Sequence, residues 1–130
     1  MASALAALAV LSGVGCTDST EPAALTGTWG GPEATLTLTM AGGTVEYACG
    51  SGTIDSGWRL DADGTWRASG QYFAGGGPLP SEGRPPHPAT YAGRVQGELL
   101  TFTVKIGDLA TSLGPFTVRR NAPGASEMCV

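Results

Sequence analysis

The feature that most constrains the fold of this chain is a strict alternation of apolar and threonine side chains over residues 34–40. Ala34, Leu36, Leu38 and Met40 fall on one side of an extended segment, and threonines fall on the other. A period of two places successive side chains on opposite faces of a β-strand. Threonine is β-branched and favours strands. We therefore expect a strand here with one buried face and one face in water.

The same alternation returns along the rest of the chain, interrupted by glycine-containing turns. Glycine occurs 21 times, and charged residues, which include most good helix formers, make up only 14%. Further extended runs are expected within 44–60, 65–72, 91–95, 100–106 and 113–118. Gly50-Ser51-Gly52 is expected to bulge or bend the first of these runs. Asp61-Ala62-Asp63-Gly64 is expected to be a hairpin turn.

About eight strands joined mostly by short turns predict an all-β antiparallel up-and-down meander. Such a meander can close into a small barrel, which removes the sheet edges; a two-sheet β-sandwich is the alternative. A glycine- and proline-rich interruption at residues 74–88 is the one long loop. The side chains expected to point inward are Leu36, Leu38, Val45, Tyr47, Trp58, Leu60, Trp66, Tyr72, Tyr91, Val95, Leu100, Phe102, Val104, Phe116 and Val118.

The first fifteen residues are small or apolar and carry no charge. A run of this length is too short to span a bilayer and is typical of a signal peptide. It ends in Gly13-Val14-Gly15-Cys16, which resembles the lipobox of bacterial lipoproteins. The resemblance implies an exported protein of the cell envelope, with residues 1–15 removed, lipid on Cys16, and residues 16–24 as a tether to a domain over 25–130. The alternative is an ordinary signal peptide cleaved near Gly15, which leaves Cys16 as a free thiol.

The chain has three cysteines, an odd number for an exported protein. If Cys16 carries lipid, Cys49 and Cys129 remain as a pair in an oxidising compartment that permits a disulfide. We therefore expect a Cys49–Cys129 bridge. A thiol metal or catalytic site is the weaker alternative, because the chain has no Cys-x-x-Cys motif and one histidine.

Gly27-Thr28-Trp29 stands at the start of the strand-rich region. It resembles the Gly-x-Trp signature that opens lipocalins and related small barrels. The resemblance implies that Trp29 plugs the closed end and that an arginine of the last strand, Arg119 or Arg120, stacks on it. The alternative is a core tryptophan that begins an unrelated β domain.

Residues 25–29 also resemble the first strand of the avidins. In the avidins, polar side chains that bind the ligand follow the tryptophan, whereas this chain has two glycines and a proline at residues 30–32. Biotin binding is therefore not expected.

The remaining residues do not form a pattern typical of a catalytic, metal-binding or nucleic-acid-binding site. A net charge of −4 without a basic cluster argues against nucleic acid as a partner. The acidic turn at 61–64 lacks the later glutamate of a calcium loop. Glu46 and Asp55 are expected to be solvated, and His87 has no neighbouring nucleophile in the sequence. We therefore expect no metal, no cofactor and no catalytic residues.

The sequence thus predicts a membrane-anchored envelope lipoprotein with a structural or interaction role. Its partner would be the membrane, through lipid on Cys16, and the sequence names no protein partner. The alternative is a lipocalin-like module that binds a small apolar ligand, with residues 74–88 as a lid. The residues expected to line its cavity are Tyr47, Trp58, Trp66, Tyr72, Tyr91 and Phe102.

Overall fold

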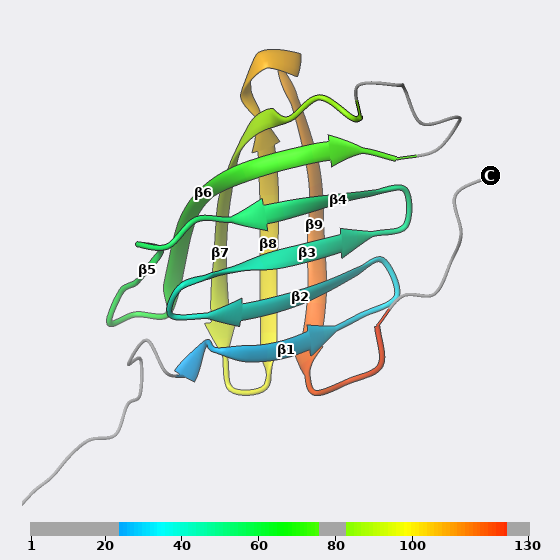
Figure 1. Cartoon of the computed structure of the whole chain (residues 1–130). Coiled ribbons are helices and arrows are strands. Elements are labelled where there is room, and N and C mark those ends of the chain that lie inside the picture. Colours follow the sequence, from blue (N-terminus) through cyan, green and yellow to red (C-terminus); the bar gives the residue numbers. More distant parts are fainter. Residues whose placement is uncertain (1–23, 76–82, 125–130) are drawn as a thin grey trace, which may run out of the picture.

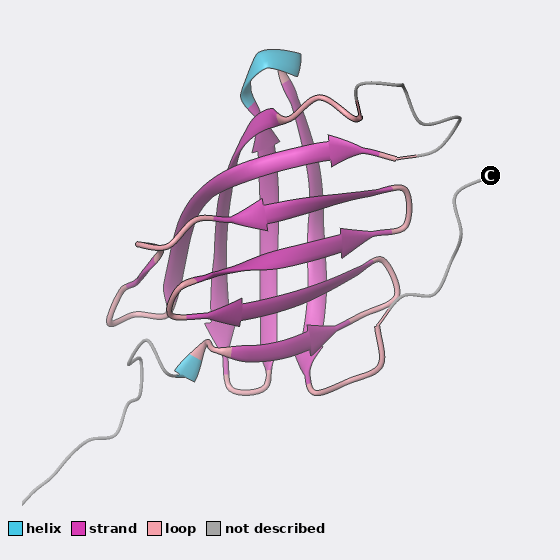
Figure 2. Cartoon of the chain, viewed as in Figure 1, coloured by secondary structure: helices cyan, strands magenta, loops and turns pink. Residues whose placement is uncertain are grey.

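The computed structural model describes residues 24–75 and 83–124, and these residues form one antiparallel β-barrel (Figures 1 and 2). Its strands are β1 (Gly27–Gly30), β2 (Ala34–Thr39), β3 (Gly42–Tyr47), β4 (Gly50–Ile54), β5 (Arg59–Leu60), β6 (Thr65–Ala74), β7 (His87–Gln96), β8 (Leu99–Ile106) and β9 (Thr111–Arg120). A short 3-10 helix, η2 (Gly107–Leu109), connects β8 to β9.

The strands follow the order of a meander, and two contacts close the ring. Pairing runs in sequence from β1 to β4, continues from β6 to β9, and joins β9 to β1. The ring closes because β4 pairs with one half of β6, while the short β5 pairs with the other half of the same edge. In Figure 1, β1–β4 cross the long axes of β7–β9 at a steep angle, and the curved β6 belongs to both groups. The predicted eight-stranded antiparallel barrel is confirmed, with β5 as an additional strand.

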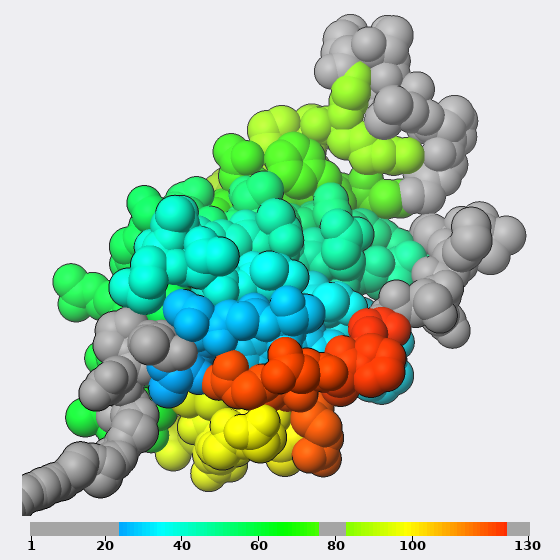
Figure 3. Space-filling model, turned by 60° about the horizontal axis from the view of Figure 1, so that its bottom comes forward, coloured from blue at the N-terminus to red at the C-terminus, as the bar shows by residue number. Residues whose placement is uncertain are grey.

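The junction between β1 and β9 is short. Only two residue pairs join these strands, Trp29 with Arg120 and Gly30 with Arg119. The chain after β9 supports the junction, since the Asn121 amide donates to the Thr28 carbonyl at 2.7 Å. Figure 3 shows this end of the barrel, with β1 in blue beside the orange-red segment that follows β9.

The prediction of a bulge at residues 50–52 was wrong. The chain turns at Ala48–Cys49, and β4 runs back antiparallel to β3, with Gly52 opposite Val45. Space explains the glycine at 52, because a Cβ there would lie 2.6 Å from the Tyr91 hydroxyl. The glycine therefore makes room for a tyrosine of β7, the next strand but one in the ring. The predicted turn at 61–64 is present, and Gly64 takes a φ of 92° in it.

The barrel interior is a packed apolar core. Its largest fully buried side chains include Trp29, Trp66, Tyr91 and Phe102. Every residue of the predicted inward set is either buried or packed against this core. The alternation seen in the sequence therefore matches alternating burial on β2, β6 and β8, whereas on β9 only Val118 is fully buried.

Trp29 fills the closed end of the barrel and is fully buried. Its indole Nε1 donates to the Leu25 carbonyl at 3.0 Å. The Arg120 guanidinium lies over the indole, with Cζ 4.3 Å from the ring centroid. Arg120 also donates to the carbonyls of Thr26, at 2.9 Å, and Ala24. The guanidinium expected over Trp29 thus belongs to Arg120, and the neighbouring Arg119 is exposed.

Candidate functional site

A cavity of about 570 Å³ lies at the end of the barrel opposite Trp29. Its position follows from the length of β1, which ends at Gly30 and leaves most of β9 without a β1 partner among the described residues. The cavity is lined by the β1–β2 turn, the β3–β4 turn, the far end of β6 and the part of β9 that β1 does not reach. These residues are Pro32, Glu33, Tyr47, Ala48, Cys49, Tyr72, Leu113 and Phe116.

Aromatic rings connect this cavity to the core. The ring centroid of Tyr47 lies 5.8 Å from that of Tyr72 and 5.4 Å from that of Phe116. Phe116 is 5.3 Å from Phe102, and Phe102 meets Trp66 edge to face at 5.9 Å. Phe102 and Trp66 are fully buried, so the barrel is filled below the cavity. An added molecule would therefore sit at the mouth, against Tyr47, Tyr72 and Phe116.

Tyr91 links the two strands that close the barrel. Its hydroxyl lies 3.1 Å from the Thr53 carbonyl of β4 and 3.3 Å from the Gln71 carbonyl of β6, and these two residues are opposite each other in the ladder. Burial raises the pKa of Tyr91 to about 12. The hydroxyl therefore stays protonated and remains a hydrogen-bond donor at neutral pH.

The side-chain hydroxyl of Tyr47 is a buried polar group at the cavity. It lies near the Tyr91 hydroxyl, and it makes no hydrogen bond of normal geometry with the described residues. Burial, together with the nearby Tyr91 hydroxyl, raises the pKa of Tyr47 far above its ordinary value. Trp66 Nε1 is a second buried polar atom without a partner in the described chain. Each such group costs about 1–3 kcal/mol of desolvation that no bond offsets.

The six predicted cavity residues separate into three groups. Tyr47 and Tyr72 line the cavity. Trp66, Tyr91 and Phe102 are fully buried below it. Trp58 lies elsewhere, in the segment between β4 and β5, where it is half-buried against the core and its Nε1 donates to the Thr39 carbonyl at 2.8 Å.

The displacement of Trp58 has a local cause. Residues 55–58 leave the ladder between β4 and β5, so the alternation is not carried across this gap. The sequence pattern predicted Leu113 and Phe116 to be apolar strand residues, but it did not indicate that they border a cavity. It gave no indication for Pro32 and Glu33 either, because they reach the cavity through the β1–β2 turn and not through a strand pattern.

A histidine and an aspartate meet beside the mouth. His87 Nδ1 lies 3.0 and 3.2 Å from the two Asp108 carboxylate oxygens. The register brings them together, since they lie two residues beyond the β7–β8 pair Ala89 and Ile106. In the sequence His87 has no neighbouring partner, because Asp108 is 21 residues away.

Some predicted features lie outside the described residues, namely Cys16, Cys129 and residues 76–82 of the loop. Cys49 is described and lies in the exposed β3–β4 turn at the cavity. Within 24–75 and 83–124, no three His, Cys, Asp or Glu side chains are grouped to hold a metal ion. No helix in the described chain is long and apolar enough to cross a bilayer.

Comparisons with family models, curated proteins and solved structures find no match. The cavity and the residues that line it are therefore the basis for assigning a function.

Proposed function

We propose that this protein is an exported, lipid-anchored barrel that binds a small apolar ligand at its open end. The observation that carries the proposal is an aromatic cavity at the mouth combined with the unpaired, buried hydroxyl of Tyr47. Ligand sites are mostly apolar, with a few polar groups that fix orientation. Their usual volume of roughly 300–1,000 Å³ includes the size of this cavity.

The lining favours a ligand with a flat or chain-like apolar part and one polar group. Tyr72, Leu113 and Phe116 supply apolar contact at the mouth. A polar group that enters beside the Tyr47 ring would supply the partner that its hydroxyl lacks. Fatty acids and isoprenoid alcohols have this build. Because the core below is filled, the apolar part would extend toward solvent and not into the barrel.

A structural or interaction role in the envelope is the second candidate. The packed core favours it, since the barrel needs no ligand to fill its lower part. Under this alternative the mouth would remain empty of small molecules.

Isothermal titration of the full chain with decanoic acid and farnesol tests the proposal. We expect binding, a loss of about five- to tenfold in affinity for Tyr47→Phe, and no measurable binding for Leu113→Trp. One hydrogen bond contributes about 1–1.5 kcal/mol, which sets the first figure. Tyr72→Phe is the matched control and should bind as the unaltered protein does. Absence of binding by either probe, or normal binding by Leu113→Trp, would refute the ligand site.

The anchor and the disulfide belong to the same proposal. The barrel favours the bridge, because Gly124 packs against the Thr35 side chain and Thr35 pairs with Glu46, three residues before Cys49. One strand spacing and three residues along a strand amount to about 11 Å. Five residues of extended chain span up to about 17 Å. Cys129 is therefore within reach of Cys49.

The intact mass of protein isolated from membranes of its host tests both modifications. We expect removal of residues 1–15, an added mass from acyl chains, and a loss of two hydrogens that reduction restores. The Cys16→Ser variant should lack the acyl mass and keep the bridge. A wild-type mass without acyl chains would exclude the anchor, and two free thiols at Cys49 and Cys129 would exclude the bridge.

A further inference from the structure

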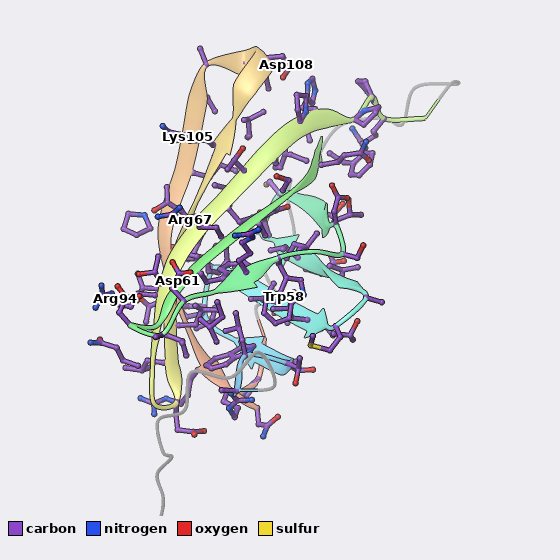
Figure 4. The ribbon with its side chains drawn as sticks, turned by 90° about the vertical axis from the view of Figure 1, so that its left-hand side faces the viewer. Trp58, Asp61, Arg67, Arg94, Lys105 and Asp108 are labelled. Carbon is purple, nitrogen blue, oxygen red and sulfur yellow. The ribbon has the colours of Figure 1, made fainter. Side chains whose placement is uncertain are left out.

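One outer face of the barrel carries most of the positive charge of the described chain. The outward positions of β6–β9 bear Arg67, Arg94, Lys105 and Arg119, and β5 adds Arg59 beside Arg67. All five side chains are exposed. We call these five residues the basic face. Figure 4 shows this face edge-on, with Arg67, Arg94 and Lys105 labelled along the left of the view, Asp61 between Arg67 and Arg94, and Asp108 at the top.

The strand positions of the basic face bear no carboxylates. Between its cations the outward positions are short or neutral, and they are Thr65, Ser69, Gln71, Thr90, Ala92, Gln96, Leu99, Thr101, Thr103, Ser112 and Thr117. The whole chain has 11 acidic and 7 basic residues, so five cations without an acid at these strand positions depart from its composition. The nearby acids lie in the segments that connect the strands, at Asp55, in the 61–64 turn, and at Glu98 and Asp108. Asp55 lines the same surface pocket as Arg59 and Arg67.

The opposite wall of the barrel, formed by β1–β3, carries no positive charge at its outward positions. The outward positions of β1–β3 are mainly threonines, together with Glu46, and they include no lysine or arginine. Thr28, Thr37 and Thr44 lie side by side on this wall. The domain is therefore polarised, with its cations on one wall.

The cations of the basic face are hardly neutralised within the described chain. Arg94 lies 3.8 Å from the Asp63 carboxylate, and both side chains are more than half exposed. Arg59, Arg67, Lys105 and Arg119 have no carboxylate within ion-pair distance in the described residues. Arg59 and Arg67 are also directly opposite each other, an arrangement that costs stability unless an anion relieves it.

We propose that the basic face docks on an anionic lipid bilayer. The face is a sheet surface whose intervening side chains are uncharged and mostly short, so its five cations can approach a plane of headgroups together. Each lysine or arginine near an anionic membrane favours binding by about fivefold. The point where the chain enters the barrel favours a bilayer over a soluble polyanion. Ala24 is held by Arg120, next to Arg119 of the basic face, and the predicted tether ends there.

This inference does not depend on the ligand site. Its choice of a bilayer over a soluble polyanion rests on the proposed lipid anchor, whereas the charge attraction itself needs no lipid on Cys16. It adds an orientation to the anchored protein, because a barrel that lies on its basic face turns the threonine wall toward the aqueous phase. The mouth then opens to the side, parallel to the membrane.

Co-sedimentation of the full chain carrying Cys16→Ser with vesicles tests the proposal. The readout is the ratio of partitioning onto phosphatidylglycerol–phosphatidylcholine vesicles to partitioning onto phosphatidylcholine alone, since any contribution of the apolar first fifteen residues is common to all variants. We expect a high ratio at 50 mM salt that falls toward one at 500 mM, because salt screens exposed charge. Arg67→Gln combined with Lys105→Gln should lower the ratio by about 25-fold.

Thr28→Glu combined with Thr44→Glu is the matched control. It changes the net charge by the same two units, on the opposite wall, and should keep most of the ratio. Circular dichroism of both double variants should show the unaltered barrel. A ratio near one for the starting protein, or equal losses in the two double variants, would overturn the proposal. Binding to soluble dextran sulfate without binding to vesicles would also overturn it, in favour of a polyanion in solution.

Discussion

Replacing Arg120 with methionine should lower the free energy of unfolding by about 2–4 kcal/mol. The guanidinium stacks on the buried Trp29 and donates to the carbonyls of Thr26 and Ala24. A cation over an indole contributes about 0.5–2 kcal/mol, and each hydrogen bond from a charged donor about 1.5–3 kcal/mol. Part of this is offset because the side chain is 22% exposed. Urea unfolding followed by tryptophan fluorescence measures the change.

The neighbouring residue provides the control for this experiment. Arg119→Met removes the same charge from the same strand, but Arg119 is exposed on the outer wall. Its effect should stay within about 0.5 kcal/mol, as for most surface substitutions. Equal losses from the two variants would mean that charge alone, and not the contact with Trp29, holds the closed end.

Gly70→Ala should cost about 3 kcal/mol or more and loosen the closure of the barrel. A Cβ at this position would lie 1.8 Å from the Thr53 carbonyl oxygen, an atom of the adjacent strand β4. Gly70 is opposite Ile54 in the ladder that closes the ring, so the strands must separate to admit a methyl group. Amide hydrogen exchange should show faster exchange along β4 and the facing half of β6.

Gly107→Ala is the matched control for the glycine variant. It lies in η2, and a Cβ there meets no atom within 4 Å. Its stability should match the unaltered protein or exceed it by up to about 1 kcal/mol, since alanine restricts the unfolded chain. If Gly70→Ala were as stable as Gly107→Ala, closure between β4 and β6 would not depend on the close approach of their backbones.

The strands could be predicted because burial alternates along them. Leu36, Leu38 and Val45 are fully buried or nearly so, and threonines occupy the positions between, so the period of two is visible without neighbours. β4 could not be predicted in the same way. Its glycines are there to admit Tyr91 from β7 and the backbone of β6, and those contacts come from residues far along the chain.

The candidate site could be predicted only in its residue types. Alternation correctly turned Tyr47 and Tyr72 inward, but the depth of each residue depends on how the strands are staggered. That stagger includes an irregularity between Phe102 and Val104 where β9 pairs with β8. Whether the Tyr47 hydroxyl finds a partner depends on distances of less than an ångström, which residue patterns do not encode. The pairing of His87 with Asp108 likewise required the register.

The short junction between β1 and β9 bears on how easily the cavity lining can change shape. Two residue pairs join these strands, whereas the β1–β2 ladder has four and the β6–β7 ladder has eight. Local opening is easiest where the fewest contacts must break. Separation here would release one edge of β9, which carries Leu113 and Phe116 of the cavity lining, while β9 stays paired with β8. The contact between Arg120 and Trp29 spans this junction and therefore opposes such an opening, although neither residue lines the cavity.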